Sequence, residues 1–198
     1  MGIRKINMIE LSFQSFLTES QYYYSNKAII LAGSPGSGKS HVVNEIILPL
    51  GFKVVDLDAL RNIVPNREHE VIKKQINHYV KYKIPCILDM TSRDPQSTQE
   101  LKEKLEKNEY TTYMIFINAP LEVAHQRNQK RSRIVDPDFL EDAWYNVQKN
   151  IPIFKSLFKG KFLEINNSKN LKEIDPELRK RVLNSWKRDV VNLLNYSG

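Results

Sequence analysis

A glycine-rich segment near the start of the chain constrains its fold more than any other feature. Residues 33–40 fit the pattern G-x-x-x-x-G-K-[ST] without a mismatch, and they directly follow the apolar residues 28–32. The glycines allow backbone angles that other residues avoid, so successive N–H groups can point inward at phosphate groups. The pattern therefore predicts a phosphate-binding loop (P-loop) between a buried strand and a helix. Its members are Gly33, Ser34, Pro35, Gly36, Ser37, Gly38, Lys39 and Ser40.

Two of these residues have further expected roles. In loops of this pattern the lysine contacts the β- and γ-phosphates and the serine binds Mg²⁺, so we assign these roles to Lys39 and Ser40. The helix that begins near Lys39 directs the positive end of its dipole at the same anion. The expected ligands are therefore ATP and Mg²⁺.

Length and composition narrow the class of protein. The chain has 198 residues, which is enough for one domain with a full core. No apolar run is as long as a membrane span and no signal peptide is recognisable, so we expect a cytoplasmic protein without a membrane partner. The single cysteine, Cys86, lies in an apolar segment and is expected to be a buried, inert thiol. The net charge of +7 favours polyanionic partners, although solvated lysines spread over the surface would give the same charge.

Apolar runs alternate with stretches of helical period, as in βαβ units. Strands are expected at residues 27–32, 52–56, 85–90, 112–117 and 161–165, and helices directly after the P-loop and at residues 67–82, 96–108, 121–131 and 138–150. The predicted fold class is α/β, a P-loop NTPase-type parallel sheet of about five strands with helices on both faces. We expect three parts: an N-terminal helical segment (1–26), the P-loop domain (27–175) and a C-terminal helix (176–198) whose apolar stripe packs on the domain.

Residues that follow the strands of such a sheet lie where ligands bind. After the second strand, Asp58 and Arg61 are three residues apart and would share one face at the start of a helix. Asp58 could accept the proton of an attacking hydroxyl, and Arg61 could hold an anionic group of the acceptor. The alternative is that Asp58 only caps a helix and that Arg61 is only solvated.

Further candidates follow the third and fourth strands. Asp89 could hold a Mg²⁺-bound water or face the acceptor, and Thr91 and Arg93 are expected to contact the acceptor. Arg127 and Arg131 are four residues apart, so on one helix face they would repel each other unless an anion lies between them. A phosphoryl group in transit would supply that anion. The alternative for these two arginines is a solvated basic helix end.

With these motifs, residues 27–167 resemble small P-loop kinases of the polynucleotide kinase and zeta-toxin type. The sequence Asp58-Ala59-Leu60-Arg61 resembles the D-x-x-R element that supplies the general base and an acceptor-binding arginine in polynucleotide kinases. Residues 127–131 resemble the lid whose arginines clamp the donor phosphates in the same enzymes.

The resemblance to zeta toxins depends on two other segments. Residues 89–93 resemble the E-G-T-G-R element with which zeta toxins hold a sugar nucleotide, with Met90 and Ser92 in place of the glycines. Residues 56–58 are similar to a D-x-D sequence of zeta toxins. The resemblance therefore implies two different acceptors.

Residues 12–20 resemble the leader that targets proteins into the prohead of tailed phages. This resemblance implies a phage protein of the host cytoplasm that is packaged in the phage head. The alternative is an ordinary amphipathic N-terminal helix.

Together these features predict a P-loop kinase that transfers the γ-phosphate of ATP to a hydroxyl group, with Lys39, Asp58, Arg127 and Arg131 as catalytic residues. The leading acceptor is the 5′-hydroxyl of a nucleic acid, because Arg61 and the basic composition both suit phosphodiesters. A nucleotide sugar and a nucleoside monophosphate remain alternative acceptors. A third alternative is an ATP-binding or ATPase module that serves assembly and has no acceptor.

Overall fold

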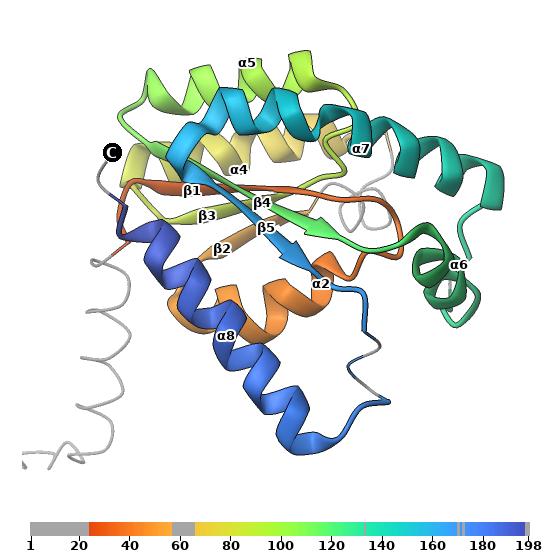
Figure 1. Cartoon of the computed structure of the whole chain (residues 1–198). Helices are drawn as coiled ribbons and strands as arrows, with labels where there is room; N and C mark the ends of the chain where they lie inside the picture. The colour runs from red at the N-terminus through yellow and green to blue at the C-terminus, as the bar shows by residue number, and fades with distance from the viewer. Residues whose placement is uncertain (1–23, 57–65, 133, 170, 172, 197–198) are drawn as a thin grey trace, which may run out of the picture.

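Five parallel strands form the centre of the molecule (Figure 1). The computed structural model describes residues 24–56, 66–132, 134–169, 171 and 173–196. The strands are β1 (Lys27–Ala32), β2 (Lys53–Asp56), β3 (Cys86–Asp89), β4 (Thr111–Asn118) and β5 (Phe162–Asn166), and they lie in the order β2-β3-β1-β4-β5. The predicted α/β class with a parallel sheet is therefore confirmed.

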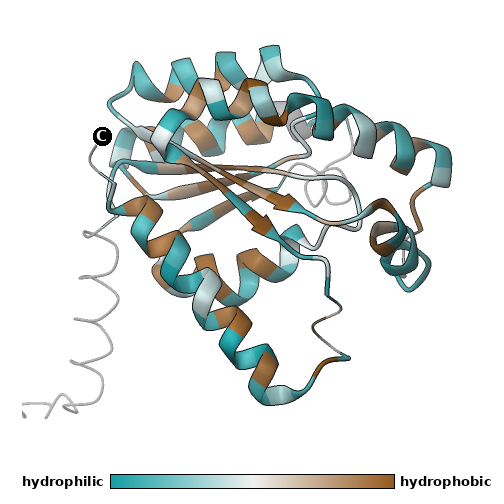
Figure 2. Cartoon of the chain, in the orientation of Figure 1, coloured by the Kyte–Doolittle hydropathy of each residue, from teal (hydrophilic) through white to brown (hydrophobic). Residues whose placement is uncertain are grey.

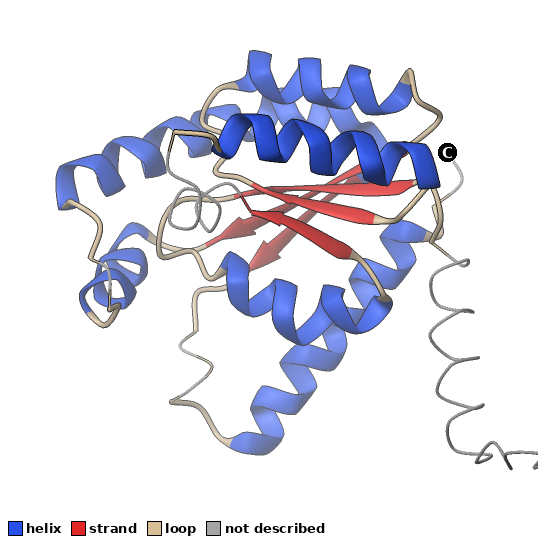
Figure 3. Cartoon of the chain, turned by 180° about the vertical axis from the view of Figure 1, so that it is seen from behind, coloured by secondary structure: helices blue, strands red, loops and turns tan. Residues whose placement is uncertain are grey.

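Helices cover both faces of this sheet, as the view from behind shows (Figure 3). One layer contains α4 (Glu68–Tyr82), α5 (Pro95–Glu106) and α7 (Pro137–Phe158). The opposite layer contains α8 (Pro176–Leu194) and the helical run that follows the P-loop, which comprises α2 (Lys39–Val42), the π-helical turn η1 (Val43–Ile47) and the 3₁₀ turn η2 (Leu48–Leu50). The helix α6 (Leu121–Gln129) lies beside the P-loop end of the sheet, and a short 3₁₀ turn, η3 (Lys159–Lys161), leads into β5.

Alternate residues of the central strands divide between two hydrophobic cores. Ile29 and Leu31 of β1 pack towards α8 and η1, whereas Ala28 and Ile30 pack towards α4, α5 and α7. Successive side chains of a strand point to opposite faces, so a strand that is covered on both sides is apolar throughout. Figure 2 shows this pattern as hydrophobic strands between helices that carry hydrophobic residues towards the sheet.

Three helices begin with an Asp-Pro pair. The Asp side chain accepts hydrogen bonds from backbone N–H groups of the first turn, and the proline occupies a position where a helix N–H has no partner. The pairs are Asp94-Pro95 of α5, Asp136-Pro137 of α7 and Asp175-Pro176 of α8. These caps explain why the observed starts lie within a residue of the predicted ones.

Three helix ends inside the domain differ from the prediction, and α5 ends at Glu106 rather than at residue 108. The helix α7 continues to Phe158 rather than ending at residue 150, although Pro152 lies inside it. Burial of Phe154 and Phe158 in the core compensates for the backbone hydrogen bond that the proline removes. The helix α6 ends at Gln129 rather than at residue 131, because the buried Asn128 bonds the backbone N–H and C=O of Val135 and closes the chain into a loop.

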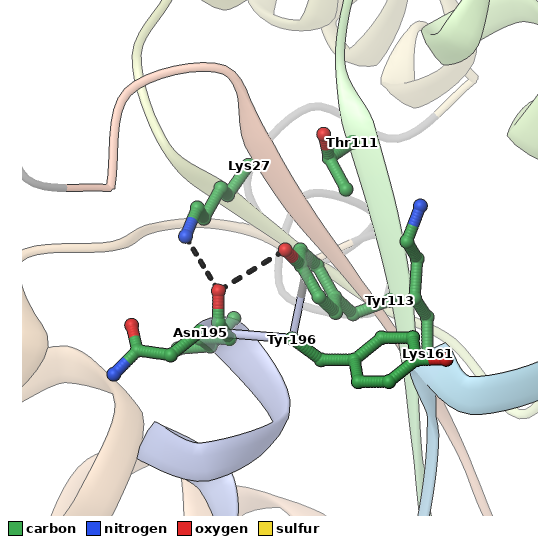
Figure 4. Close-up of a pocket in the computed structure, with 7 residues that line it drawn as sticks. Lys27, Thr111, Tyr113, Lys161, Asn195 and Tyr196 are labelled. Atoms are coloured by element: carbon green, nitrogen blue, oxygen red, sulfur yellow. Dashed lines mark hydrogen bonds between the residues drawn. The ribbon is translucent and has the colours of Figure 1, made fainter. Parts of the chain in front are cut away.

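The C-terminal end of α8 is held at the edge of the sheet that lies opposite the P-loop. Lys27 Nζ, at the start of β1, donates to the carbonyl of Leu194 over 2.5 Å, and the hydroxyl of Tyr113 donates to the same oxygen over 3.1 Å (Figure 4). A cation at a helix C-terminus stabilises the exposed carbonyls there. Trp186 and Val190 of the same helix lie in the core. The C-terminal half of α8 is thus packed on the sheet, whereas Leu178 in its first turn, which the predicted apolar stripe included, is exposed.

Several sequence predictions concern single residues or segments. Cys86 is buried, and its burial raises the pKa of the thiol to about 12, as expected for an inert cysteine. The described residues form no helix that is long and apolar enough to span a membrane. Most of the expected N-terminal segment, residues 1–23, lies outside the described residues, as does the stretch 57–65 with Asp58 and Arg61.

Candidate active site

The P-loop leaves the carboxyl end of β1, in the middle of the sheet. Gly36 and Gly38 have positive φ angles of 79° and 94°, which favour glycine. A Cβ on Gly36 would lie 2.9 Å from the Cα of Ala124 in α6 and closer still to its carbonyl oxygen. A Cβ on Gly38 would collide with the side chain of Asn167. The loop is therefore packed tightly against α6 and against the segment after β5.

Three polar side chains of the loop are candidates for phosphate binding. Lys39 Nζ donates to the carbonyl of Gly33 over 2.8 Å and to that of Ser34 over 3.4 Å, so its ammonium group lies over the loop. The hydroxyl of Ser37 is buried and has no hydrogen-bond partner within the described part of the chain. Ser40 is exposed in the first turn of α2. These groups fit a polyphosphate, because a P-loop lysine and an unsatisfied hydroxyl are both donors to phosphate oxygens.

Arg127 binds the outer side of the same loop. Its guanidinium donates to the carbonyls of Gly36 and Ser37 over 3.3 and 3.2 Å, and to those of Asn167 and Lys169 over 2.9 and 2.8 Å. Burial lowers the pKa of this guanidinium from its ordinary value. Arg127 therefore joins the P-loop to the segment that follows β5.

Two carboxylates lie side by side where β2 and β3 end. Asp56 and Asp89 are directly paired across these parallel strands, so both side chains leave the sheet on the same side. The part of the chain that the structure describes brings no three His, Cys, Asp or Glu side chains together as a metal site. Mg²⁺ that accompanies a nucleotide needs no such cluster, because one or two carboxylates suffice when phosphate oxygens and waters complete its shell.

The segment after β3 is fixed to the P-loop through its backbone. The carbonyl of Thr91 accepts a hydrogen bond from the N–H of Gly33 over 3.3 Å. Ser92 has a positive φ of 55° and its buried hydroxyl donates to the carbonyl of Leu31 over 3.1 Å. Asn150 of α7 donates to the carbonyl of Arg93 over 2.8 Å. Thr91 and Arg93 are thereby held beside the loop.

The side chain of Arg93 points to the start of α7. Its guanidinium lies 4.9 Å from the ring centre of Phe139 and donates to Asp142 over 3.1 Å. Phe139 is 46% exposed, which is unusual for a phenylalanine. An exposed ring beside a guanidinium can contact a planar or an anionic group of a substrate.

The two predicted arginines after β4 are separated by the end of α6. Arg127 is on the helix, whereas Arg131 follows the helix end and is exposed. The two arginines therefore do not share one helix face, as the sequence predicted, since the bonds of Asn128 end the helix before Arg131.

The sequence profile of the AAA domain family matches residues 29–151. The chain belongs to this family. The matched region runs from β1 into α7, and so includes the P-loop, Asp89, Arg93 and Arg127. Comparison with curated proteins found no match.

Solved structures share the fold of this AAA domain. A gluconokinase from Sinorhizobium meliloti 1021 superposes with a TM-score of 0.57 at 17% identity, covering 87% of this chain and 98% of the other. A shikimate kinase from Bacteroides thetaiotaomicron gives a TM-score of 0.53 at 14% identity, covering 83% and 98%. The complex AvrRxo1-ORF1:-ORF2 with ATP gives a TM-score of 0.57 at 10% identity, covering 80% and 62%. The fold of the AAA domain is therefore that of the P-loop kinases.

Two residues that contact the site were not predicted from the sequence. Asn150 and Asn167 are buried, and each donates its side-chain amide to a backbone carbonyl of the site. Asn167 directly follows β5, at the edge of the sheet where ligands bind, and that position was an available signal. Asn150 lies in the middle of a helix, where the sequence offers no comparable signal.

Proposed function

We propose that this protein is a kinase that transfers the γ-phosphate of ATP to a hydroxyl group of a second substrate. One observation carries the proposal: the P-loop lies beside the end of β3, and a backbone bond from Gly33 to Thr91 joins the two. A donor-binding loop thus adjoins a polar segment that suits an acceptor. The fold shared with a gluconokinase and a shikimate kinase supports the same reaction class.

The P-loop would bind the triphosphate of ATP. The N–H groups of the loop, the hydroxyl of Ser37 and the ammonium group of Lys39 would donate to phosphate oxygens. Lys39 would exchange its bonds to the carbonyls of Gly33 and Ser34 for bonds to the phosphates. Ser40 and Asp89 would hold Mg²⁺, which when bound offsets the negative charge of the phosphates.

The acceptor hydroxyl would approach from the ends of β2 and β3. Asp58 follows the end of β2 by two residues, and we propose that it accepts the hydroxyl proton as the general base. Arg61, Thr91 and Arg93 would hold the acceptor, with Arg93 presented beside Phe139. Asp89 would face the acceptor if it does not bind Mg²⁺.

The two arginines after β4 would stabilise the charge that develops during transfer. Arg131 is exposed in the loop between α6 and α7, and we propose that it closes over the transferred phosphoryl group. Arg127 would act mainly through its charge, because its guanidinium is already bound to four backbone carbonyls. With this division of roles, replacing Arg131 should lower kcat more than it lowers the affinity for ATP.

For the acceptor we propose the 5′-hydroxyl of a nucleic acid. The net charge of +7 and the arginines at the acceptor side suit phosphodiesters. The exposed ring of Phe139 offers a surface for a base to stack on. Polynucleotide-kinase-like activity belongs to this proposal, and zeta-toxin-like activity on a nucleotide sugar is the alternative to it. Both of them, and a phage origin, depend on the sequence resemblance alone.

Transfer of radiolabel from [γ-³²P]ATP tests the proposal. The acceptor panel contains 5′-hydroxyl oligonucleotides, nucleotide sugars, nucleoside monophosphates, gluconate and shikimate, the last two because of the similar folds. Label on the oligonucleotide, lost in Lys39→Met and Asp58→Asn and reduced steeply by salt, is the expected result. ATP hydrolysis without label on any acceptor would support the assembly-module alternative and refute the kinase.

A further inference from the structure

We propose that Asn167 is a positioning residue that, together with Arg127, orients the P-loop for triphosphate binding. Asn167 directly follows β5 and is only 3% exposed. It lies on the outer side of the loop and takes no part in the proposed chemistry. The inference extends the proposed function, because it concerns how the ATP-binding loop acquires its shape.

The geometry of the peptide bond gives the outward carbonyls of the loop a need for donors. In a trans peptide the carbonyl of one residue points away from the N–H of the next, and the described chain contains no cis peptide. An N–H of the loop that points inward therefore has the carbonyl of the residue before it pointing outward. Buried outward carbonyls need donors from other parts of the chain.

Asn167 and Arg127 are those donors. The carbonyl of Ser37 accepts from Asn167 Nδ2 over 2.8 Å and from Arg127 Nη1 over 3.2 Å. The carbonyl of Gly36 accepts from Arg127 Nη1 over 3.3 Å. The peptide between Ser37 and Gly38 is thus fixed with its oxygen outward, which directs the N–H of Gly38 into the loop.

Every polar atom of Asn167 has a hydrogen-bond partner, and Nδ2 is the one that bonds Ser37. Its backbone N–H donates to Asn118 over 2.7 Å, which extends the pairing of β4 and β5 by one residue. Its backbone carbonyl and Oδ1 accept from Arg127 Nη2 over 2.9 and 3.3 Å. These partners fix the orientation of the amide, because only the NH₂ side of the group can donate to Ser37.

The peptide between Ser37 and Gly38 needs a partner that fixes its orientation. Gly38 has a φ of 94° and no Cβ, so the peptide before it can rotate at a low energetic cost. The missing Cβ also leaves the space that the Asn167 amide occupies. Gly38 therefore allows the backbone its positive φ, and Asn167 holds the peptide before Gly38 in one orientation.

The test compares Asn167→Leu with Asn167→Ala by isothermal titration with ATP. Leucine keeps the volume of asparagine and removes the donor, whereas alanine removes both. We expect both variants to bind ATP about tenfold more weakly than wild type, since each loses one buried hydrogen bond to a loop carbonyl. A packing role alone would spare Asn167→Leu. The matched control is Asn166→Ala, because Asn166 is exposed and its described side-chain bond is to Ser168 alone.

Each outcome has a definite meaning. Wild-type affinity in Asn167→Leu would overturn the inference. Absence of ATP binding by the wild type would overturn both this inference and the proposed function. ATP binding that depends on Asn167, without transfer to any acceptor, would support the inference and refute the kinase.

A measurement on wild-type protein covers the case in which the variants do not fold. In ¹⁵N-labelled protein, the side-chain amide protons of Asn167 should exchange slowly with solvent, because the group is buried and bonded. They should also shift when ATP is added, since Ser37 lies between Asn167 and the phosphate-facing N–H of Gly38. Fast exchange without an ATP-dependent shift would overturn the inference.

Discussion

Replacing Asn150 by leucine tests how the segment after β3 is held beside the P-loop. Asn150 is 7% exposed, and its Nδ2 donates to the carbonyls of Arg93 over 2.8 Å and of Ser92 over 3.4 Å. Leucine has a similar volume but no donor. The variant therefore leaves two backbone carbonyls without this partner and creates no cavity.

The expected loss of stability follows from these bonds. A buried carbonyl that loses its partner costs about 1–3 kcal/mol, and the longer bond to Ser92 adds less. Ser92 also has a positive φ of 55°, a conformation that persists only while its surroundings hold it. We expect the free energy of unfolding to fall by about 2 kcal/mol, which for a chain of this size lowers Tm by roughly 4–8 °C.

Urea unfolding monitored by circular dichroism measures this change. The matched control is Asn146→Ala, one turn earlier on α7, where the half-buried side-chain amide bonds Asp142 of its own helix and no other described residue. The control should change stability by less than about 0.5 kcal/mol. If Asn150→Leu is as stable as this control, the bonds of Asn150 do not hold the segment and the reasoning is refuted.

Four further predictions concern other parts of the molecule. Lys39→Met should abolish detectable phosphoryl transfer with an unchanged circular dichroism spectrum, and residual transfer near the wild-type rate would contradict the role of the lysine. Gly36→Ala should lower ATP affinity by more than tenfold in a titration, because the added methyl group meets the backbone of Ala124; an unchanged affinity would show that the loop can move away from α6. Cys86 should resist iodoacetamide in the native protein and react in urea, as judged by mass spectrometry, since its pKa of about 12 leaves almost no thiolate. Lys27→Met should lower the free energy of unfolding by about 1 kcal/mol through the loss of its bond at the end of α8, and should leave ATP affinity unchanged.

The parallel sheet and the P-loop could be predicted from the sequence because both have local signals. Each strand is an apolar run, and the eight-residue loop pattern is contiguous. The starts of α5, α7 and α8 were predictable because an Asp-Pro pair precedes each. In these cases, the residues that determine the structure are neighbours in the chain.

The predictions that differed depended on contacts between distant residues. The end of α6 is set by bonds from Asn128 to Val135, and α7 passes Pro152 because Phe154 and Phe158 are buried against the sheet. Spacing in the sequence does not show either contact. The roles of Asn150 and Asn167 were missed for the same reason, since their partners lie 57 and 130 residues away.

The donors that hold the carbonyls of Gly36 and Ser37 come from outside the P-loop motif. Within the loop, the N–H of Ser37 and the ammonium group of Lys39 donate to the carbonyl of Ser34, but an N–H that faces the phosphates cannot also donate to the carbonyls of Gly36 and Ser37. Arg127 after β4 and Asn167 after β5 supply these donors from later parts of the chain. Carboxylates could not replace them, because an ionised carboxylate only accepts hydrogen bonds and would repel the phosphates. The motif therefore predicts the ligand, and the later residues determine whether the loop keeps the shape that binds it.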